Sequence, residues 1–335
     1  MCWAGEPMAK ITLEGRVFDC ATDETILDAL LRQGENIPHS CRKGTCGTCL
    51  MRSESGPPPE AAQRGLRRTL RSQHHFHACQ CVPTGDMQIA RRHTAAPCRA
   101  AILSNEVLAP SICRIRIRLP ESFSYQAGQS VLVRRPDGLE RSYSLASVPS
   151  LDELAELHVR VHEHGQMSRW LRDSATVREE LEIQGPFGDC IYLPGAPDAP
   201  MLLIATGTGL APLLGIVRDA LNQGHRGRIV LYHGVRHAAD SYGRDALMKL
   251  QAAHSNLETV LCVSGESAPD GFVQGRADDA AFARFEDLTG WRVYLCGSPG
   301  MVSGAKKAAY LAGAHMDDIC ADSFEIVPTR ATSAS

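Results

Sequence analysis

Three cysteines in one short loop indicate the first chemistry. Cys41, Cys46 and Cys49 have the C-x4-C-x2-C spacing that brings three thiolates to one 2Fe-2S cluster, and Cys79 and Cys81 both follow at a distance suited to a fourth ligand. Such a cluster gains and loses one electron at a time. The cysteine pattern therefore predicts one-electron transfer.

A zinc site and a Rieske-type centre are the alternatives for these cysteines. Zinc sites commonly combine two close cysteine pairs, but Cys79-x-Cys81 has the wrong spacing for a zinc knuckle. A Rieske centre pairs each histidine with a nearby cysteine in two separate loops, which disfavours His74, His75 and His77 as ligands. The residues favour an iron-sulfur cluster and leave its fourth ligand open between the two later cysteines.

A glycine turn supplies the second chemical signal. The apolar segment 201–205 runs into Gly207-Thr208-Gly209, and a helix is expected over 210–221. A strand that ends in glycines and opens a helix presents backbone N–H groups and a positive dipole end to a pyrophosphate. Pro212 departs from the dinucleotide fingerprint because it stands where the third glycine belongs. A turn needed only for chain reversal is the alternative.

A second strand end strengthens the nucleotide interpretation. The segment Cys296-Gly297-Ser298-Pro299 also closes an apolar strand and starts a helix. Two strand ends of one parallel sheet meet at the crevice where such folds bind nucleotides. The two segments together therefore predict a nucleotide site.

The elements that position these residues fall into three blocks. With 335 residues, the chain is long enough for two or three domains, and 44% hydrophobic and 22% charged residues are globular values. Residues 1–92 predict a strand pair over 10–18, a helix over 24–32 and a closing strand over 86–89. The other blocks are a linker over 93–98, an antiparallel barrel over 99–198 with a strand at 112–119, and a doubly wound parallel sheet over 199–335.

Composition bounds the partners and the compartment. A net charge of −3 gives no reason to expect nucleic acid or an anionic membrane as a partner. We see neither an apolar run of membrane-spanning length nor an N-terminal signal pattern. Thirteen cysteines would be hazardous in an oxidising compartment. A cytoplasmic enzyme is expected.

Further motifs, together with the cysteine loop, carry a family resemblance. They are, in order, Arg141-Ser142-Tyr143-Ser144, Gly165-Gln166-Met167-Ser168, Gly207-Thr208-Gly209-Leu210-Ala211-Pro212, Cys296-Gly297-Ser298-Pro299 and Ala321-Asp322-Ser323-Phe324. Over nearly the whole chain the sequence resembles the reductase components of multicomponent aromatic-ring oxygenases, especially the naphthalene dioxygenase type. This resemblance implies a multidomain α+β and α/β fold: a β-grasp, plant-type ferredoxin domain, an antiparallel flavin-binding β-barrel and a parallel-sheet nicotinamide domain.

The resemblance also implies residue roles. Arg141 holds the flavin phosphate, Tyr143 packs on the isoalloxazine and Ser144 reaches its N5 edge; Cys79, in Ala-Cys-Gln, is the fourth cluster ligand and Cys81 a bystander. The implied catalytic residues are Ser144, Cys296 and Phe324. Together with Arg236 and Asp240, which are chosen for their position after a strand, the expected cofactor-binding residues are Arg141, Ser142, Tyr143, Ser144, Gly165, Gln166, Met167, Ser168, Gly207, Thr208, Gly209, Pro212, Cys296, Gly297 and Phe324.

The three modules imply an electron path. A nicotinamide gives up two electrons as a hydride, whereas the cluster accepts one at a time, so a flavin must stand between them. The ferredoxin-first order resembles the FAD-using branch of the family. A carboxylate near the adenosine ribose favours NADH and an arginine favours NADPH. Because Arg236 and Asp240 both follow the next strand, we expect NADH with NADPH as an alternative.

The expected acceptor is a ferredoxin or a terminal oxygenase, most simply an aromatic-ring dioxygenase. Reductases of the same build for a diiron monooxygenase or a sugar-deoxygenating enzyme are alternatives, as is a redox sensor that does not turn over. Arg42 and Lys43 lie beside the cluster ligands, and the first 92 residues carry 12 Lys and Arg against 10 Asp and Glu. As a hypothesis, these two residues belong to a docking face for an acidic acceptor.

Overall fold

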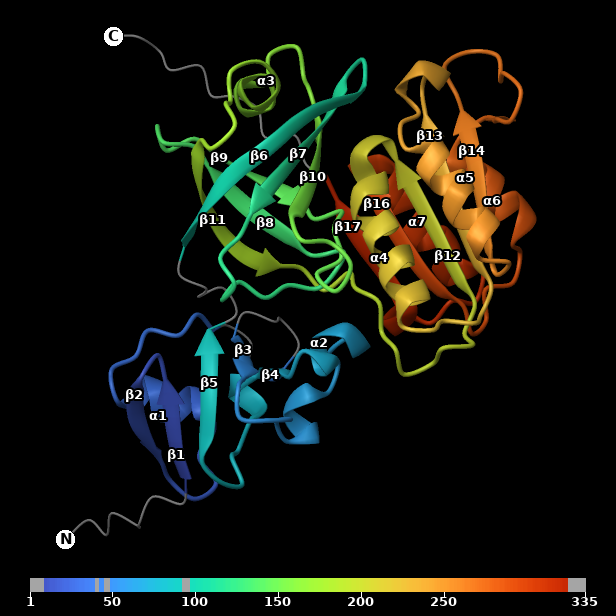
Figure 1. The fold of residues 1–335 in the computed structure, drawn as a ribbon. Helices are drawn as coiled ribbons and strands as arrows, with labels where there is room; N and C mark the ends of the chain where they lie inside the picture. Colours follow the sequence, from blue (N-terminus) through green and yellow to red (C-terminus); the bar gives the residue numbers. More distant parts are fainter. Residues whose placement is uncertain (1–8, 40–41, 45–48, 92–96, 325–335) are drawn as a thin grey trace, which may run out of the picture. The chain divides into compact units, whose positions relative to one another are not determined.

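The structure, a computed structural model, describes residues 9–39, 42–44, 49–91 and 97–324. The chain divides into two compact units, Met1–Thr94 and Ala95–Ser335 (Figure 1). Within the described residues, none of the helices has both the length and the apolar character needed to cross a membrane.

The first unit is a five-stranded mixed sheet covered by one longer helix. Strand β1 pairs antiparallel with β2 and parallel with β5, as in a β-grasp fold, and the sheet order is β2-β1-β5-β3-β4. Helix α1 begins at Ile26 and not at Glu24, because the Thr25 hydroxyl caps it by accepting from the Asp28 N–H. The elements are β1 (Ala9–Leu13), β2 (Arg16–Cys20), α1 (Ile26–Arg32), β3 (Leu50–Ser53), α2 (Arg68–Ser72), β4 (His75–His77) and β5 (Met87–Arg91), with 3-10 turns η1 (Glu60–Gln63) and η2 (Ala78–Gln80).

The second unit begins with the expected antiparallel barrel. Its six strands have the order β10-β7-β6-β11-β8-β9, and a bridge between Leu145 and Leu157 closes the sheet between β9 and β10. Strand β7 alternates as predicted, with Ile115 and Ile117 fully buried in the barrel core. The elements are β6 (Cys98–Ala109), β7 (Ile112–Arg118), β8 (Ser130–Arg134), β9 (Glu140–Ser144), β10 (Ala155–Arg160), α3 (Gln166–Asp173) and β11 (Glu180–Phe187).

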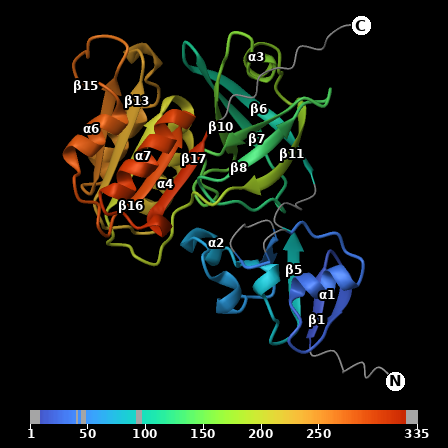
Figure 2. The ribbon, with the colours of Figure 1, turned by 180° about the vertical axis from the view of Figure 1, so that it is seen from behind.

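A six-stranded parallel sheet completes the second unit. The strand order is β15-β14-β13-β12-β16-β17. From β12 the chain builds the sheet first toward β15 and then, from β16, on the opposite side, so the crevice of the sheet lies at the carboxyl ends of β12 and β16. Two separate cores line its faces, one with α4 and α5 and the other with α6 and α7, which Figures 1 and 2 show from opposite sides. The strands are β12 (Met201–Thr206), β13 (Ile229–Val235), β14 (Leu257–Val263), β15 (Val273–Gln274), β16 (Arg292–Gly297) and β17 (Ile319–Ser323); the helices are α4 (Leu210–Asn222), α5 (Arg244–Ala253), α6 (Ala277–Arg284) and α7 (Pro299–Leu311), with 3-10 turns η3 (Gly207–Gly209), η4 (Ala238–Asp240) and η5 (Met316–Asp318).

Candidate functional site

A cavity of about 610 Å³ opens at the carboxyl ends of the parallel strands. It lies where this class of sheet binds nucleotides, and its size suits a cofactor. The predicted residues that line it are Gly207, Thr208, Arg236, Asp240, Gly297 and Phe324.

Two glycines let the ends of β12 and β16 touch. A Cβ atom on Gly209 would lie 2.3 Å from the Cys296 carbonyl oxygen, and one on Gly297 would lie 2.1 Å from Thr206 Oγ1. The Ser298 N–H donates to that same threonine oxygen at 3.1 Å. Because neither glycine position has room for a side chain, the backbone N–H groups of both turns stay close to the cavity floor.

The proline of the glycine turn also has a structural reason. Pro212 is buried in the first turn of α4. The first N–H groups of a helix have no partner within it, so a proline at this point costs no intrahelical hydrogen bond. Helix α4 can therefore start directly after the glycine turn although a proline replaces the third glycine.

Ser144 and Cys296 meet on one carboxylate that the sequence reasoning did not single out. The Ser144 hydroxyl donates to Asp322 Oδ2 at 2.8 Å, and the Cys296 thiol lies 3.9 Å from the same oxygen. Burial raises the pKa of Asp322, and the hydrogen bond from the serine opposes this rise. Burial also raises the pKa of Cys296, so the thiol stays protonated. Asp322 could have been noticed as a carboxylate at the end of an otherwise apolar strand.

Strand β9 carries the predicted flavin residues on alternating faces. Arg141 and Tyr143 share one face, and Ser142 and Ser144 share the other. Arg141 donates to the Glu140 carbonyl at 2.7 Å and has no carboxylate partner within the described part of the chain. Burial raises the pKa of Tyr143, whose half-buried ring packs on the barrel core. A guanidinium not paired to an acid and a neighbouring partly exposed aromatic ring fit a phosphate and a flat ring system.

The predicted second phosphate segment lies at the start of α3. The Ser168 hydroxyl accepts from the His162 N–H at 3.2 Å and lies 3.4 Å from the Gly165 carbonyl oxygen. A Cβ on Gly165 would lie 2.3 Å from that hydroxyl. Gln166 and Met167 open the helix, and their backbone N–H groups are of the type that binds phosphate.

The described part of the cluster region brings one of the two candidate fourth ligands to the loop. Cys41 and Cys46 lie outside the described residues. Cys49 and Cys79 are buried, and the Ala78 N–H donates to the Cys49 carbonyl at 3.1 Å. The Gln80 amide donates to the Arg42 carbonyl at 3.0 Å and lies 3.9 Å from Cys79 Sγ. Gln80 thus connects the loop at Arg42 to Cys79.

Cys81, the other candidate, faces the core of the first unit. Its side chain is fully buried among apolar residues, and burial raises its pKa to about 12. A thiol that resists ionisation is a poor metal ligand, because ligands bind as thiolates. This placement favours Cys79 over Cys81.

The cavity wall contains charged residues that the sequence reasoning missed. Arg160, at the end of β10, points to the glycine turn: its Nη1 atom would be 3.4 Å from a Cβ on Gly207. Arg276 forms a two-point pair with Asp278, at 2.9 and 3.1 Å. Arg160 could be recognised only after folding, because it comes from a different domain than the turn that it faces.

The two residues proposed to select the nicotinamide differ in their surroundings. Asp240 accepts from the Ser111 hydroxyl of the barrel at 3.2 Å, which orients its carboxylate. Arg236 is exposed, and its guanidinium has no acidic partner among the residues that the structure describes. Both line the cavity.

Comparison with known proteins matches each part of the chain. Residues 10–84 match the 2Fe-2S iron-sulfur cluster binding domain, 99–192 the oxidoreductase FAD-binding domain and 203–307 the oxidoreductase NAD-binding domain. These matches confirm the predicted classes of cofactor.

Similar proteins extend over almost the whole chain. The reductase subunit of an aromatic O-demethylase from Amycolatopsis is 36% identical, over 89% of this chain and 93% of that protein. The ferredoxin–NAD(P)(+) reductase component of the Pseudomonas putida naphthalene 1,2-dioxygenase system is 31% identical, over 92% and 96%. The crystal structure of an Amycolatopsis cytochrome P450 reductase has a TM-score of 0.67 and 33% identity, over 94% of this chain and 98% of that one.

Proposed function

Because this chain belongs to the family of iron-sulfur flavoprotein reductases that serve multicomponent oxygenases, we propose specific roles for its site residues and a class of electron acceptor. The activity is that of an NAD(P)H-dependent oxidoreductase. A hydride passes from NAD(P)H to FAD, and single electrons leave through a 2Fe-2S cluster to a ferredoxin or an oxygenase component.

The proposed residue roles rest on one observation: Ser144 and Cys296 both contact the Asp322 carboxylate. This shared contact brings the end of a strand with flavin-type residues to the strand end that borders the nucleotide cavity. Bound FAD supplies the chemistry that converts a hydride into single electrons. Arg141 and the segment Gly165–Ser168 bind its phosphates, Tyr143 packs on its ring, and Ser144 orients its reactive edge.

The nicotinamide nucleotide occupies the cavity above the glycine turn. Gly207, Thr208, Gly209 and Gly297 offer backbone N–H groups to the pyrophosphate, and the Arg160 guanidinium adds positive charge opposite the turn. Cys296 orients the nicotinamide ring, and Phe324, on the cavity wall, covers it.

NADH is the preferred donor. The oriented Asp240 carboxylate suits a ribose diol and would repel a 2′-phosphate. Arg236 supports a weaker activity with NADPH. Flavin reduction rates measured with each nucleotide test this choice, because a higher kcat/KM for NADPH would contradict it.

The cluster ligands are Cys41, Cys46, Cys49 and Cys79, in a domain over residues 1–92. The remaining division is a linker over 93–98, an FAD domain over 99–198 and a nicotinamide domain over 199–335. The ranges of the three domain matches support this division. The thirteen cysteines support a cytoplasmic location.

The terminal acceptor is an oxygenase that acts on an aromatic compound. The naphthalene dioxygenase reductase, 31% identical, supports an aromatic-ring dioxygenase. The O-demethylase reductase, 36% identical, supports a second candidate, a cytochrome P450 that acts on an aromatic ether. Reduction of each purified acceptor by this chain and NADH, at equal concentrations, distinguishes them: the true partner is expected to react with the higher kcat/KM.

A further inference from the structure

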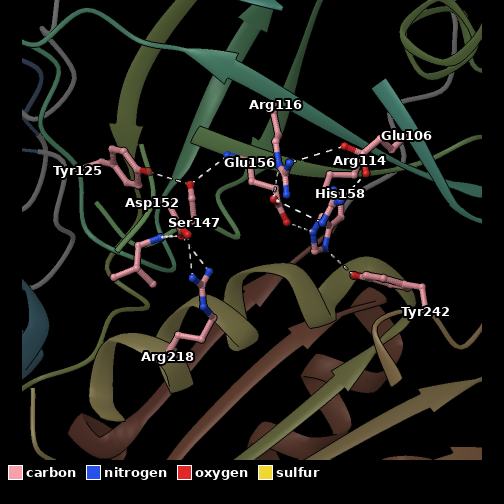
Figure 3. A network of polar contacts seen from close by, with 11 residues as sticks. Glu106, Arg114, Arg116, Tyr125, Ser147, Asp152, Glu156, His158, Arg218 and Tyr242 are labelled. Carbon is pink, nitrogen blue, oxygen red and sulfur yellow. Dashed lines mark hydrogen bonds and ion pairs between the residues drawn. The ribbon is translucent and has the colours of Figure 1, made fainter. Parts of the chain in front are cut away.

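Tyr242 lies at the junction between the barrel and the parallel sheet, in the segment that joins η4 to α5. It is only 2% exposed, and its hydroxyl lies 3.1 Å from His158 Nδ1 of strand β10 (Figure 3). Its ring also packs edge-on against two histidines, with centroids 5.1 Å from His158 and 5.7 Å from His233. One side chain therefore contacts both domains of the second unit.

The hydrogen bonds around His158 have a defined direction. His158 Nε2 lies 2.8 Å from Glu156 Oε1, while Arg116 donates to the other oxygen of Glu156 at 3.1 Å. Burial raises the pKa of Glu156, but the hydrogen bonds from His158 and Arg116 outweigh it and hold that pKa at about 2. A carboxylate accepts only, so Nε2 carries a proton. In a neutral imidazole Nδ1 is then the acceptor, and Tyr242 donates to it.

His233 connects the same tyrosine to the glycine turn. It is fully buried, and its Nε2 donates to the Gly207 carbonyl at 3.0 Å. Burial lowers the pKa of His233 to about 4, so the ring is neutral at neutral pH. Within the described residues, its Nδ1 has no hydrogen-bond partner, so the ring orientation depends on this one bond and on packing against Tyr242.

The start of α4 touches the same segment. A Cβ on Gly243, the residue after Tyr242, would lie 3.5 Å from Leu210 Cδ2, and Tyr242 belongs to the same buried core cluster as Leu210. Tyr242 therefore reaches the glycine turn through His233, and its segment packs against the first turn of α4. Its link to the barrel is His158.

We propose that Tyr242 is a positioning residue for the nicotinamide nucleotide: its hydroxyl ties the segment between η4 and α5 to the barrel through His158, and its ring keeps His233 on the Gly207 carbonyl. This inference rests on the proposed binding of the nucleotide at Gly207–Gly209. It adds that a buried hydrogen bond between the two domains, from Tyr242 to His158, keeps this glycine turn in place. Loss of that bond is expected to loosen the turn without emptying the flavin site.

The chain contains a matched control. Tyr192, also 2% exposed, lies 3.2 Å from His225 Nδ1 with the same edge-on geometry, at a centroid distance of 5.6 Å and an angle of 88°. This second pair lies near the amino ends of the strands, away from the cavity. Tyr192→Phe thus removes an equivalent tyrosine–histidine hydrogen bond without changing the nucleotide cavity.

The test uses the full-length, FAD-loaded protein. NAD⁺ affinity is measured by calorimetric titration, flavin reduction by stopped-flow absorbance with saturating NADH, and FAD content and melting temperature are recorded for each variant. Tyr242→Phe is expected to weaken NAD⁺ binding about five- to tenfold, the usual effect of one lost hydrogen bond, and to slow flavin reduction. Tyr192→Phe is expected to bind NAD⁺ like the wild type.

Two histidine variants give an independent answer. His158→Phe removes the acceptor and should weaken NAD⁺ binding like Tyr242→Phe, whereas His158→Asn places an oxygen near the position of Nδ1 and should restore most of the affinity. Equal NAD⁺ affinities for Tyr242→Phe and Tyr192→Phe, or loss of FAD together with NAD⁺ affinity, would overturn the inference. Wild-type protein that bound no NAD⁺ would instead contradict the proposed function on which the inference rests.

Discussion

The Ser144 hydroxyl of the barrel donates to the Asp322 carboxylate of β17 at 2.8 Å, and the Cys296 thiol lies 3.9 Å from the same carboxylate oxygen. Residues of β9, β16 and β17 therefore meet at one partly buried carboxylate. The Asp322 carboxylate thus joins the proposed flavin strand to the strands that border the nucleotide cavity.

Asp322→Asn should slow flavin reduction by NADH at least tenfold, because the amide orients the serine and the thiol less strongly than a carboxylate does. It should also raise the melting temperature at pH 7. Burial raises the pKa of Asp322, so its ionised form opposes folding above that pKa, and this penalty disappears in the amide. Stopped-flow absorbance and calorimetry measure the two effects.

Asp245→Asn, at an exposed position on α5, is the control and should change neither quantity. A variant of Asp322 that reduced its flavin at the wild-type rate would show that the acid has no part in positioning the reacting groups.

Gly209→Ala should destabilise the protein by about 2–4 kcal/mol and weaken NADH binding, because the new methyl group would lie 2.3 Å from the Cys296 carbonyl oxygen. Gly300→Ala, in helix α7 beside the same cavity, meets no atom within 4 Å and should be neutral or slightly stabilising. Denaturant melts and NADH titrations compare the two. Equal stabilities would refute the close approach of the strand ends.

Cys79→Ser should abolish the visible absorption of the cluster while the flavin remains, because the cluster loses a thiolate. Cys81→Ser should keep the cluster, since this residue faces the core and its thiol pKa is raised to about 12. Iron and acid-labile sulfide analysis of both variants provides the measurement. Cluster loss only in the Cys81 variant would reverse the assignment.

Glu156→Gln should lower the stability by about 1–3 kcal/mol at pH 7, because His158 and Arg116 stabilise the carboxylate. The folded-state pKa of about 2 lies below the ordinary value of 4.5, so this stability is present above pH 4.5 and is lost as the pH falls toward 2. Urea melts between pH 3 and 7 should show the difference shrinking.

Glu180→Gln removes an exposed acid from the same barrel and is expected to have an effect below about 0.5 kcal/mol at every pH. A Glu156 variant with the same small, pH-independent effect would argue against the buried network.

Charge reversal at Arg42 and Lys43 tests the docking hypothesis. The double variant to Glu should slow electron delivery to an acidic acceptor about tenfold at low salt, and the deficit should shrink as salt is added. Flavin reduction by NADH should be unchanged. Reversal of Lys10 and Arg16, which lie on the β1–β2 hairpin, is the matched control because Arg16, like Arg42, forms an ion pair. Equal slowing by both pairs of reversals would point to net charge alone.

The fold was predictable where the hydrophobic periodicity is strong or where glycines mark a turn. The buried apolar run of β12 and the alternation of β7 both predicted their strands, and the glycine turn predicted the start of α4. Helix α1 starts two residues after the predicted Glu24, because the Thr25 side chain caps it.

The site was harder to predict because its members come from different domains. Motifs supplied Ser144 and Cys296, but Asp322 and Arg160 acquire meaning only when β17 and β10 reach the cavity edge. His158, Tyr242 and His233 each resemble ordinary core residues in the sequence. Only their mutual distances show a connected network.

If one chain splits a hydride into single electrons, anaerobic titration of the purified protein with NADH will show it. We expect one FAD, two irons and two acid-labile sulfides per chain, with both the flavin and the cluster absorption bleached by NADH. Protein with bound flavin but without sulfide, or with a cluster whose absorption NADH leaves unchanged, would contradict it.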